Sequence, residues 1–304
     1  MRVLYVAEIV GKPGLHCIKT ALAELKKERG VDLVIANGDG ATGGYGIGKN
    51  HTMYLRKLGV DVITGGDQTF FKKDMAEHID TAYHVLRPAN LPPEMPGRGW
   101  RHFTVRPAEW AELDNPPADA EGEAEETAPG DSGGHAPGEG KAPGVQVTVV
   151  SLLGQSGYER IHAANPYHWL NHTIDRLRKN SVAVILDFHA LTTAEKYTMF
   201  HFADGMVTAV FGSGQRVQTA DAQVLPSGTA VICDAGRTGS CSSVSGFQPE
   251  AEIRGYLSKL PSRSEDWWDD LRLQGALLEI DTASGYVTSF ESISIPCAKP
   301  TEKS

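Results

Sequence analysis

Cysteine is scarce in this chain of 304 residues, which contains Cys17, Cys233, Cys241 and Cys297 and no other. Their spacing matches no metal-binding pattern, and four thiols are too few to crosslink a chain of this length. A disulfide-stabilised secreted protein is therefore excluded. We expect a cytoplasmic protein with reduced thiols.

Long apolar runs are also missing. No segment approaches the roughly 18 uncharged apolar residues that a membrane-spanning helix requires. The apolar N-terminal segment MRVLYVAEIVG is short and contains Glu8, so it predicts a core strand rather than a signal peptide. We therefore expect no membrane as a partner.

An excess of basic residues is absent as well, because the formal net charge is −9. Ten acidic residues lie between Pro107 and Gly144, where Lys141 is the one base. Outside this segment 28 acids balance 28 bases, and no basic stripe with interleaved aromatic residues occurs. We therefore expect no nucleic acid as a partner.

The segment 107–144 is rich in Pro, Gly, Ala and Glu, so it cannot bury enough apolar surface to offset the entropy of ordering. We expect a disordered acidic insertion inside one domain that spans residues 1–296. Residues 297–304 are expected to form a flexible C-terminal tail.

Strand-like and helix-like segments alternate along the rest of the chain, which is typical of an α/β fold. The helix that Pro13 opens is expected to end at Gly30, a residue suited to a C-cap. The turn DTASG near the C-terminus predicts a β-hairpin. Strands are expected at 3–7, 32–36, 61–64, 145–153, 182–188, 206–211 and 229–233, further helices at 49–58, 166–179, 193–202 and 249–258, and the hairpin strands at 276–280 and 286–293.

Polar residues follow these strands. In chain order they are Glu8, Asp39, Asp67 with Gln68, His189, and Gly214 with Arg216. Because the ends of parallel strands meet at one edge of a sheet, we expect these side chains to converge. Three carboxylates and a histidine on one edge indicate a metal or acid/base site.

A glycine-rich segment lies in the same region, and Gly38, Gly40 and Gly43 match the pattern GxGxxG. A dinucleotide-binding motif of this kind must open a helix, whereas this one continues into GGYGIG. Two other interpretations stay open. The backbone amides of the loop could bind a phosphate, or the glycines could allow two loops to approach closely.

The segments NGDGATGGYGI, GVDVITGGDQTF, VLRPANLP, DFHALTTAEK and VFGSGQRVQTAD, in this order, resemble the YmdB-like bacterial phosphodiesterases. These belong to the calcineurin-like metallophosphoesterases. The resemblance covers residues 1–103 and 145–296, and it implies a four-layer α/β/β/α sandwich. It also implies two divalent metals that activate a hydroxide against a phosphodiester, with cyclic nucleotides as usual substrates.

Most of the ligand positions that the resemblance implies carry other residues here. The family's aspartate falls on Glu8, its glutamate and asparagine fall on Asp39 and Gly40, and its asparagine and catalytic histidine fall on Asp67 and Gln68. Two further family histidines fall on Gly214 and Arg216. His189 alone keeps the family residue.

These changes predict a reduced metal site. A guanidinium has no lone pair for a metal, and Gly214 has no side chain. Glu8, Asp39, Asp67 and His189 remain as ligands, enough for at most one ion, and such carboxylate-rich ligation favours Mn or Mg over Zn. Gln68 cannot transfer a proton as a histidine would. We expect Arg216 to replace the metal charge through a bidentate salt bridge with Glu8 or Asp39.

Two functions are compatible with these residues. The first is a degenerate phosphodiesterase that keeps a structural, ligand-binding or regulatory role without two-metal catalysis. The alternative is an active metal-dependent phosphodiesterase that uses one metal or a rearranged site. For either function we expect a homo-oligomer and a nucleotide or phosphate ligand.

Overall fold

The computed structural model describes residues 1–107, 144–158, 160–260 and 263–300. The predicted acidic insertion therefore lies outside the described residues except for its two ends. Of the predicted C-terminal tail, residues 297–300 are described, and the amide of Cys297 donates to the carbonyl of Leu271 at 2.8 Å.

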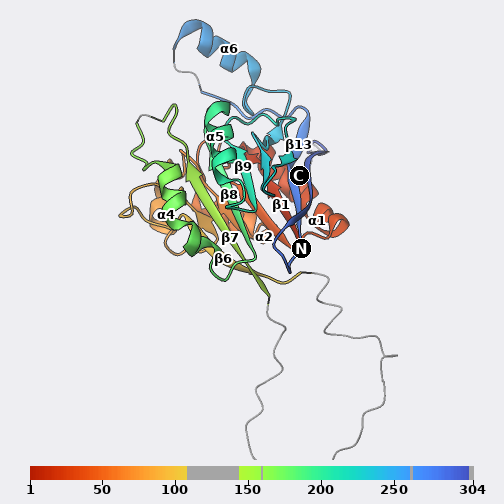
Figure 1. The fold of residues 1–304 in the computed structure, drawn as a ribbon. Helices are drawn as coiled ribbons and strands as arrows, with labels where there is room; N and C mark the ends of the chain where they lie inside the picture. The colour runs from red at the N-terminus through yellow and green to blue at the C-terminus, as the bar shows by residue number, and fades with distance from the viewer. Residues whose placement is uncertain (108–143, 159, 261–262, 301–304) are drawn as a thin grey trace, which may run out of the picture.

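Two β-sheets form the centre of the molecule (Figure 1). The first has the order β2-β12-β13-β1-β3-β4-β5, with β14 paired to β13, and the second has the order β10-β11-β9-β8-β7-β6. The strands of the first sheet are β1 (Arg2–Val6), β2 (Glu8–Ile9), β3 (Leu33–Asn37), β4 (Val62–Thr64), β5 (Val85–Leu86), β12 (Arg237–Ser240), β13 (Leu271–Ile280) and β14 (Val287–Pro296). Those of the second are β6 (Trp100–Val105), β7 (Val145–Leu153), β8 (Ala183–His189), β9 (Ala209–Ser213), β10 (Gln223–Val224) and β11 (Ala230–Ile232).

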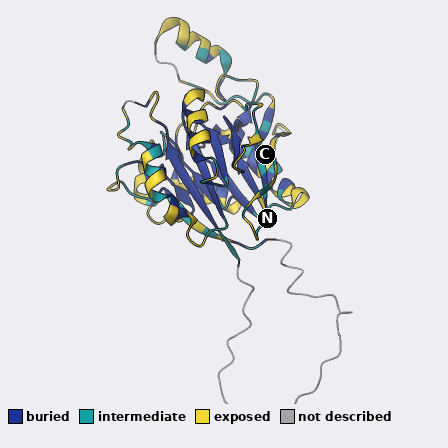
Figure 2. Ribbon diagram, viewed as in Figure 1, coloured by how far each residue is buried: buried dark blue, intermediate teal, exposed yellow. Residues whose placement is uncertain are grey.

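The two sheets pack face to face because their strands alternate between two apolar faces. In β1, Val3 and Tyr5 face the second sheet, whereas Leu4 and Val6 belong to the core on the other side. The ring of Tyr5 stacks on Phe211 of β9 with the ring centroids 4.4 Å apart. Figure 2 shows the strands as the buried centre of the molecule.

Helices cover the outer face of each sheet. α1, α2 and α3 contribute residues such as Leu22, Leu55 and Met75 to the core outside the first sheet. α4 and α5 contribute residues such as Leu170 and Phe200 outside the second. The six helices of the described chain are α1 (Gly11–Arg29), α2 (Lys49–Lys57), α3 (Lys73–His78), α4 (Pro166–Arg178), α5 (Thr193–Ala203) and α6 (Pro249–Ser258). The fold is thus a four-layer α/β/β/α sandwich, as expected.

The predicted helices and strands are present, with shifted ends. The first helix begins at Gly11 rather than Pro13 and ends as predicted at Gly30, whose φ of 58° is left-handed. The hairpin strands are longer than predicted, and their pairing runs from Arg272 opposite Pro296 to Ile280 opposite Val287. Six elements were not predicted from the sequence: the short strands β2, β5, β10 and β12, the short helix α3, and β6, whose alternating polar residues lie at a sheet edge.

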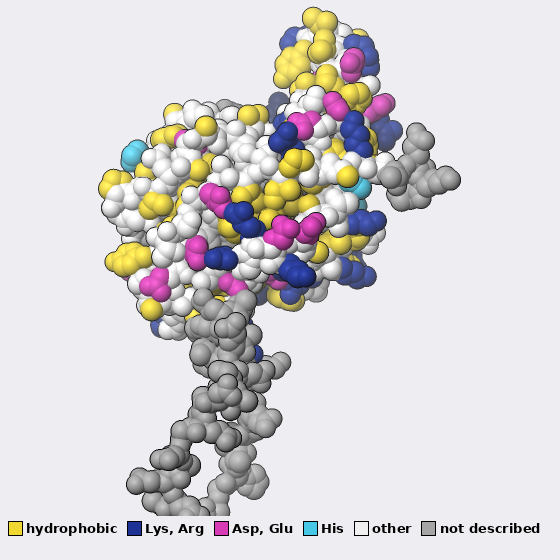
Figure 3. All heavy atoms as spheres, turned by 90° about the vertical axis from the view of Figure 1, so that its right-hand side faces the viewer, with side chains coloured by type: hydrophobic (Ala, Val, Ile, Leu, Met, Phe, Trp, Pro, Cys, Tyr) yellow, Lys and Arg dark blue, Asp and Glu magenta, His cyan; other side chains and the backbone are white. Residues whose placement is uncertain are grey.

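Helix α6 projects away from the sandwich (Figure 1). Its side chains Ile253, Tyr256 and Leu257 are 53%, 72% and 81% exposed. Figure 3 shows hydrophobic side chains gathered on this projection.

None of the described helices combines the length and the apolar character that spanning a membrane requires.

Candidate functional site

The ends of parallel strands from both sheets bring the predicted residues together. Glu8 lies in β2, Asp39 follows β3, Asp67 follows β4, His189 ends β8 and Arg216 follows β9. β1, β3, β4 and β5 run parallel, as do β7, β8 and β9, so their carboxyl ends share one edge. We call Glu8, Asp39, Asp67, Gln68, His189 and Arg216 the strand-end site.

Asp39, Asp67 and His189 form a close group, with one candidate ligand atom from each within 4.8 Å of the others. His189 Nε2 lies 2.9 Å from Asp67 Oδ1 and 3.9 Å from Asp39 Oδ2. Asp39 and His189 are almost fully buried, whereas the side chain of Asp67 is 26% exposed. The arrangement places two carboxylates and an imidazole around one point.

Asp39 also holds the loop after β4. Its Oδ1 accepts the amide of Gly66 at 2.6 Å, and its Oδ2 accepts the amide of Gln68 at 2.9 Å. A Cβ on Gly66 would lie 2.5 Å from the ring of His189, so only glycine allows this approach. The carboxylate therefore orients the loop that carries Asp67.

A buried hydrogen-bond chain orients His189. The Ser213 hydroxyl donates to Asp187 Oδ1 at 2.6 Å and lies 3.0 Å from His189 Nδ1. Because the single Ser213 proton goes to Asp187, His189 Nδ1 must donate to Ser213. His189 Nε2 then faces Asp67, either as a second donor or as a free lone pair. Asp187 and Ser213 were not predicted from the sequence, although the i, i+2 spacing of Asp187 and His189 in a strand predicts a shared face.

Burial and charge shift the ionisation of this group. Burial raises the pKa of Asp39 to about 7, against the opposing charge of His189. Burial alone would lower the pKa of His189, but its hydrogen bond to Asp67 and the charges of Asp39 and Asp67 raise that pKa to about 9. For Asp67, burial is outweighed by the hydrogen bond and charge of His189, so its pKa is lowered. His189 and Asp67 therefore form an ion pair at neutral pH.

Arg216 contacts Glu8, one of the two expected partners. Arg216 Nε lies 2.9 Å and Nη2 lies 2.7 Å from Glu8 Oε1. Both nitrogens thus meet one carboxylate oxygen, which corrects the expected bidentate geometry with two oxygens. The other oxygen, Oε2, is buried and has no hydrogen-bond partner among the described residues.

The backbone fixes the position of Arg216. Its φ of 59° is left-handed, which is unusual for a non-glycine residue. Its Nη2 donates to the carbonyl of Gly44 at 2.9 Å, and its own carbonyl accepts Arg237 Nη1 at 2.7 Å. The Gly38–Gly48 loop therefore supplies a carbonyl to the guanidinium. Its GxGxxG part, residues 38–43, lies outside any helix, and α2 begins only at Lys49, whereas a dinucleotide motif would open the helix itself.

A buried ion pair that was not predicted from the sequence supports the same region. Lys196 Nζ donates to Asp234 Oδ2 at 2.8 Å, and both side chains are at most 2% exposed. The same Oδ2 accepts the amide of Gln215 at 3.0 Å. This pair thereby anchors the segment that carries Arg216.

Gly40 and Gly214, at positions where the resemblance implies metal ligands, differ in their surroundings. A Cβ on Gly40 would lie 3.0 Å from Arg216 Nη2 and 2.9 Å from Glu8 Oε1, so the ion pair fills the space of a side chain there. Gly214 has a φ of 103°, which disfavours any side chain. Position 40 therefore leaves no room for a ligand beside Arg216.

Gln68 lies where the resemblance implies a catalytic histidine. Its backbone amide is used by Asp39, and its side-chain Oε1 is buried without a hydrogen-bond partner among the described residues. An amide does not titrate, so this side chain can orient a ligand but cannot transfer a proton.

The donor set fits one divalent ion. Asp39, Asp67 and His189 offer two carboxylates and an imidazole around one point. The resemblance implies further ligands at positions 8, 40 and 214, but Glu8 is paired with Arg216 and both other positions are glycine. The described residues therefore do not fit a two-metal centre.

A cavity of about 780 Å³ opens beside Asp67 and Gln68. Its walls are mostly apolar and aromatic, including Tyr45, Phe70 and Phe71, and we call it the aromatic cavity. The exposed side chains of Arg160 and His162 also line it. Its size and its few polar groups suit a small ligand.

A model of the YmdB-like protein family matches residues 4–112 and 125–293. The chain belongs to the YmdB-like family. Family membership accounts for the metallophosphoesterase sandwich, and it agrees with the resemblance drawn from the sequence.

Curated and solved relatives agree with this membership. The chain is 28% identical over 295 residues to a 2',3'-cyclic-nucleotide 2'-phosphodiesterase of Bacillus subtilis, with 97% of both chains covered. It is 29% identical to a putative phosphatase/phosphodiesterase of Mycoplasma pneumoniae, with 97% of this chain and 93% of the relative covered. A solved structure of a novel phosphatase from Mycoplasma pneumoniae superposes with a TM-score of 0.79 at 28% identity, covering 99% of this chain and 95% of that one.

A solved hypothetical protein from Thermus thermophilus has a TM-score of 0.78 at 24% identity, with 99% and 100% of the two chains covered. At that identity the likeness shows the fold alone. Of the two curated relatives, one is named a phosphodiesterase and the other a putative phosphatase/phosphodiesterase, and the family points to divalent metals. Among the described residues, Asp39, Asp67 and His189 form a group that could hold a metal ion.

Proposed function

We propose that this chain is a degenerate YmdB-like phosphodiesterase, which has lost two-metal catalysis and keeps a ligand-binding role. The observation that carries the proposal is the contact of Arg216 Nε and Nη2 with Glu8 Oε1 at 2.9 and 2.7 Å. A permanently charged guanidinium has replaced a metal as the partner of that carboxylate. The positive charges of Arg216 and His189 then balance the negative charges of Glu8 and Asp67 without a metal ion.

The surrounding residues support this replacement. The Arg216 guanidinium fills the space that a side chain at Gly40 would need, so the arginine and the glycine are compatible as a pair. Gln68 supplies no proton at the position of the catalytic histidine. A site with an amide at position 68 can hold a ligand but lacks, at that position, the proton-transfer group that the resemblance implies for hydrolysis.

The ligand that we propose is a phosphate ester or nucleotide bound between the strand-end site and the aromatic cavity. Glu8 Oε2 and Gln68 Oε1 are buried acceptors without partners among the described residues, so a ligand hydroxyl or amine can donate to them. Tyr45 and Phe71 line the cavity and offer aromatic faces to a base.

Metal content and hydrolysis test the proposal together. The protein is stripped with EDTA, incubated with Mn²⁺, desalted and measured for bound Mn²⁺ and for cleavage of bis(p-nitrophenyl) phosphate and 2',3'-cyclic AMP. We expect at most one Mn²⁺ per chain and no cleavage above that of His189→Ala. Two bound ions per chain would overturn the proposal. Cleavage by the wild type would also overturn it if Asp39→Ala abolishes that cleavage and the exposed-residue control Glu94→Ala retains it.

The alternative is an active phosphodiesterase with one divalent ion, and the close group of Asp39, Asp67 and His189 is the observation that favours it. The carboxylate oxygens favour Mn or Mg over Zn. When bound, such an ion would act as a Lewis acid on a phosphate ester. Asp39 would orient the Gly66–Gln68 loop, and His189 would be held by Ser213.

The cellular setting and the assembly are proposals as well. A reducing cytoplasm agrees with Cys17, Cys233, Cys241 and Cys297, which are all free thiols. We propose that a homo-oligomer forms through the exposed apolar side chains of α6. Light scattering should show a smaller particle for Tyr256→Glu/Leu257→Glu than for the control Arg254→Gln, and equal masses would argue against this surface.

A further inference from the structure

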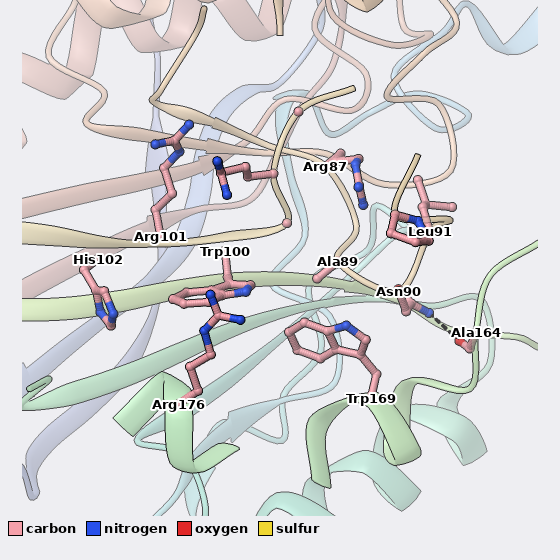
Figure 4. Close-up of a pocket in the computed structure, with 14 residues that line it drawn as sticks. Arg87, Ala89, Asn90, Leu91, Trp100, Arg101, His102, Ala164, Trp169 and Arg176 are labelled. Carbon is pink, nitrogen blue, oxygen red and sulfur yellow. Dashed lines mark hydrogen bonds between the residues drawn. The ribbon is translucent and has the colours of Figure 1, made fainter. Parts of the chain in front are cut away.

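A second cavity, of about 740 Å³, lies between the β5–β6 segment and helix α4. Arg98, Trp100 and Arg101 from the first segment line it together with Trp169 and Arg176 of α4. Figure 4 shows Arg87 and Arg101 on one side and Trp169 and Arg176 on the other. We call it the arginine–tryptophan cavity.

No acidic side chain of the described chain lines this cavity. Arg98, Arg101 and Arg176 take part in no ion pair with another described residue, and Arg101 Nε is buried without a hydrogen-bond partner there. Like charges gathered in one hollow repel each other, and a bound anion removes that repulsion. The cavity therefore favours an anionic ligand.

Arg87 has a different role in the same wall. It is 5% exposed, and its guanidinium donates to the carbonyls of Pro88, Pro92, Met95 and Pro96. Its donors are thus used to shape the loop of residues 88–96. The three arginines that remain available to a ligand are Arg98, Arg101 and Arg176.

Two indoles complete the wall. The guanidinium of Arg176 lies 5.0 Å from the centroid of the Trp100 ring, which orients the arginine beside the hollow. Trp169, from α4, is half-buried and points into the cavity (Figure 4). An aromatic base can stack on such an indole while guanidinium groups bind a phosphate.

We propose that the arginine–tryptophan cavity is a nucleotide-binding site, in which Arg98 and Arg101 bind the phosphate and Trp169, on the other side of the cavity, stacks on the base. A volume of about 740 Å³ exceeds the needs of inorganic phosphate and matches cavities that hold cofactor-sized ligands. The site is distinct from the strand-end site, and the two cavities adjoin at Leu91, which lines both. The proposal does not rest on the proposed function, because it uses no residue of the strand-end site.

The test titrates the full-length protein in EDTA with AMP, adenosine and inorganic phosphate, and follows tryptophan fluorescence and calorimetric heat. AMP should bind at least about tenfold more tightly than adenosine, since a charge-assisted phosphate contact is lost with the nucleoside. Arg98→Gln/Arg101→Gln should weaken AMP binding about tenfold or more. Trp169→Ala should weaken AMP binding about tenfold and leave phosphate binding unchanged.

One variant serves as the control. Arg178→Gln removes an exposed arginine of the same helix that does not line the cavity. It should bind AMP like the wild type, and thermal unfolding shows whether each variant is folded. No AMP binding up to about 1 mM, or equal binding by Arg98→Gln/Arg101→Gln, would overturn the proposal. Binding of a short RNA through these arginines without AMP binding would also overturn it.

Discussion

Arg216 and the arginines of the arginine–tryptophan cavity carry the same guanidinium group in opposite surroundings. Arg216 is 8% exposed and touches Glu8 Oε1 with two nitrogens. Arg98, Arg101 and Arg176 line an open hollow without a carboxylate among its described lining residues. The first charge is satisfied inside the protein, and the others are available to a ligand. The number of charged residues in a region therefore says less about its function than their pairing does.

The contrast between these arginines is tested most strongly by Arg216→Met. Glu8 would then be a buried carboxylate without a partner, so we expect the free energy of unfolding to fall by about 3–5 kcal/mol. Urea denaturation measures the loss. In a double-mutant cycle with Glu8→Gln the coupling energy should exceed about 1 kcal/mol. If Arg216→Met lowers the free energy of unfolding by less than about 1 kcal/mol, Arg216 is not the structural partner of Glu8.

A second variant tests whether Arg216 and Gly40 depend on each other. Gly40→Asn should lower the free energy of unfolding by about 1–3 kcal/mol, because its Cβ would meet Arg216 Nη2 and Glu8 Oε1. In the background Arg216→His the same substitution should cost less, since the guanidinium no longer fills the space. Thermal and urea unfolding of the four proteins give these costs, and equal costs in both backgrounds would refute the dependence.

The pH dependence of stability tests the ion pair of His189 and Asp67. The pKa of His189 is raised from 6.5 to about 9, so the folded protein binds this proton more tightly than the unfolded chain does. The stabilisation is complete below pH 6.5 and is lost as the pH rises through about 9. In EDTA we expect the free energy of unfolding to fall by about 3 kcal/mol over this interval. His189→Asn should flatten the fall, and an unchanged slope would contradict the ion pair.

The smallest effect is expected in the arginine–tryptophan cavity. Arg101→Gln should change the free energy of unfolding by no more than about 0.5 kcal/mol, because the side chain has no ionic partner among the described residues. Urea denaturation at low salt provides the measurement, with Arg178→Gln as the exposed control. A loss as large as that of Arg216→Met would mean that Arg101 is a structural residue.

Part of the strand-end site could be predicted from the sequence. Residues that follow parallel strands meet at one edge, so Glu8, Asp39, Asp67 and His189 converge regardless of the details of packing. The contact of Arg216 with Glu8 follows from charge, because a buried carboxylate needs a cation. The sequence could not predict that both Arg216 nitrogens contact one Glu8 oxygen. That geometry depends on the left-handed backbone of Arg216 and on the carbonyl of Gly44.

The arginine–tryptophan cavity could not be predicted by the same reasoning. Arg98 and Arg101 are separated from Arg176 by more than seventy positions and by the acidic segment. Outside that segment the chain has 28 acids and 28 bases. A net charge near zero gives no sign of a local group of arginines. Only the tertiary packing around the β6 edge of the second sheet brings these arginines to the lining of one hollow.

The sequence by itself determined the α/β class, the order of most strands and helices, and the identity of the groups at the strand ends. These depend on hydrophobic periodicity and on chemistry that each residue carries wherever it lies. The tertiary structure alone decided which charges are paired, which glycines leave space for Arg216, and where the arginines face solvent. Pairing depends on distances of a few ångströms between distant segments, and sequence spacing does not contain those distances.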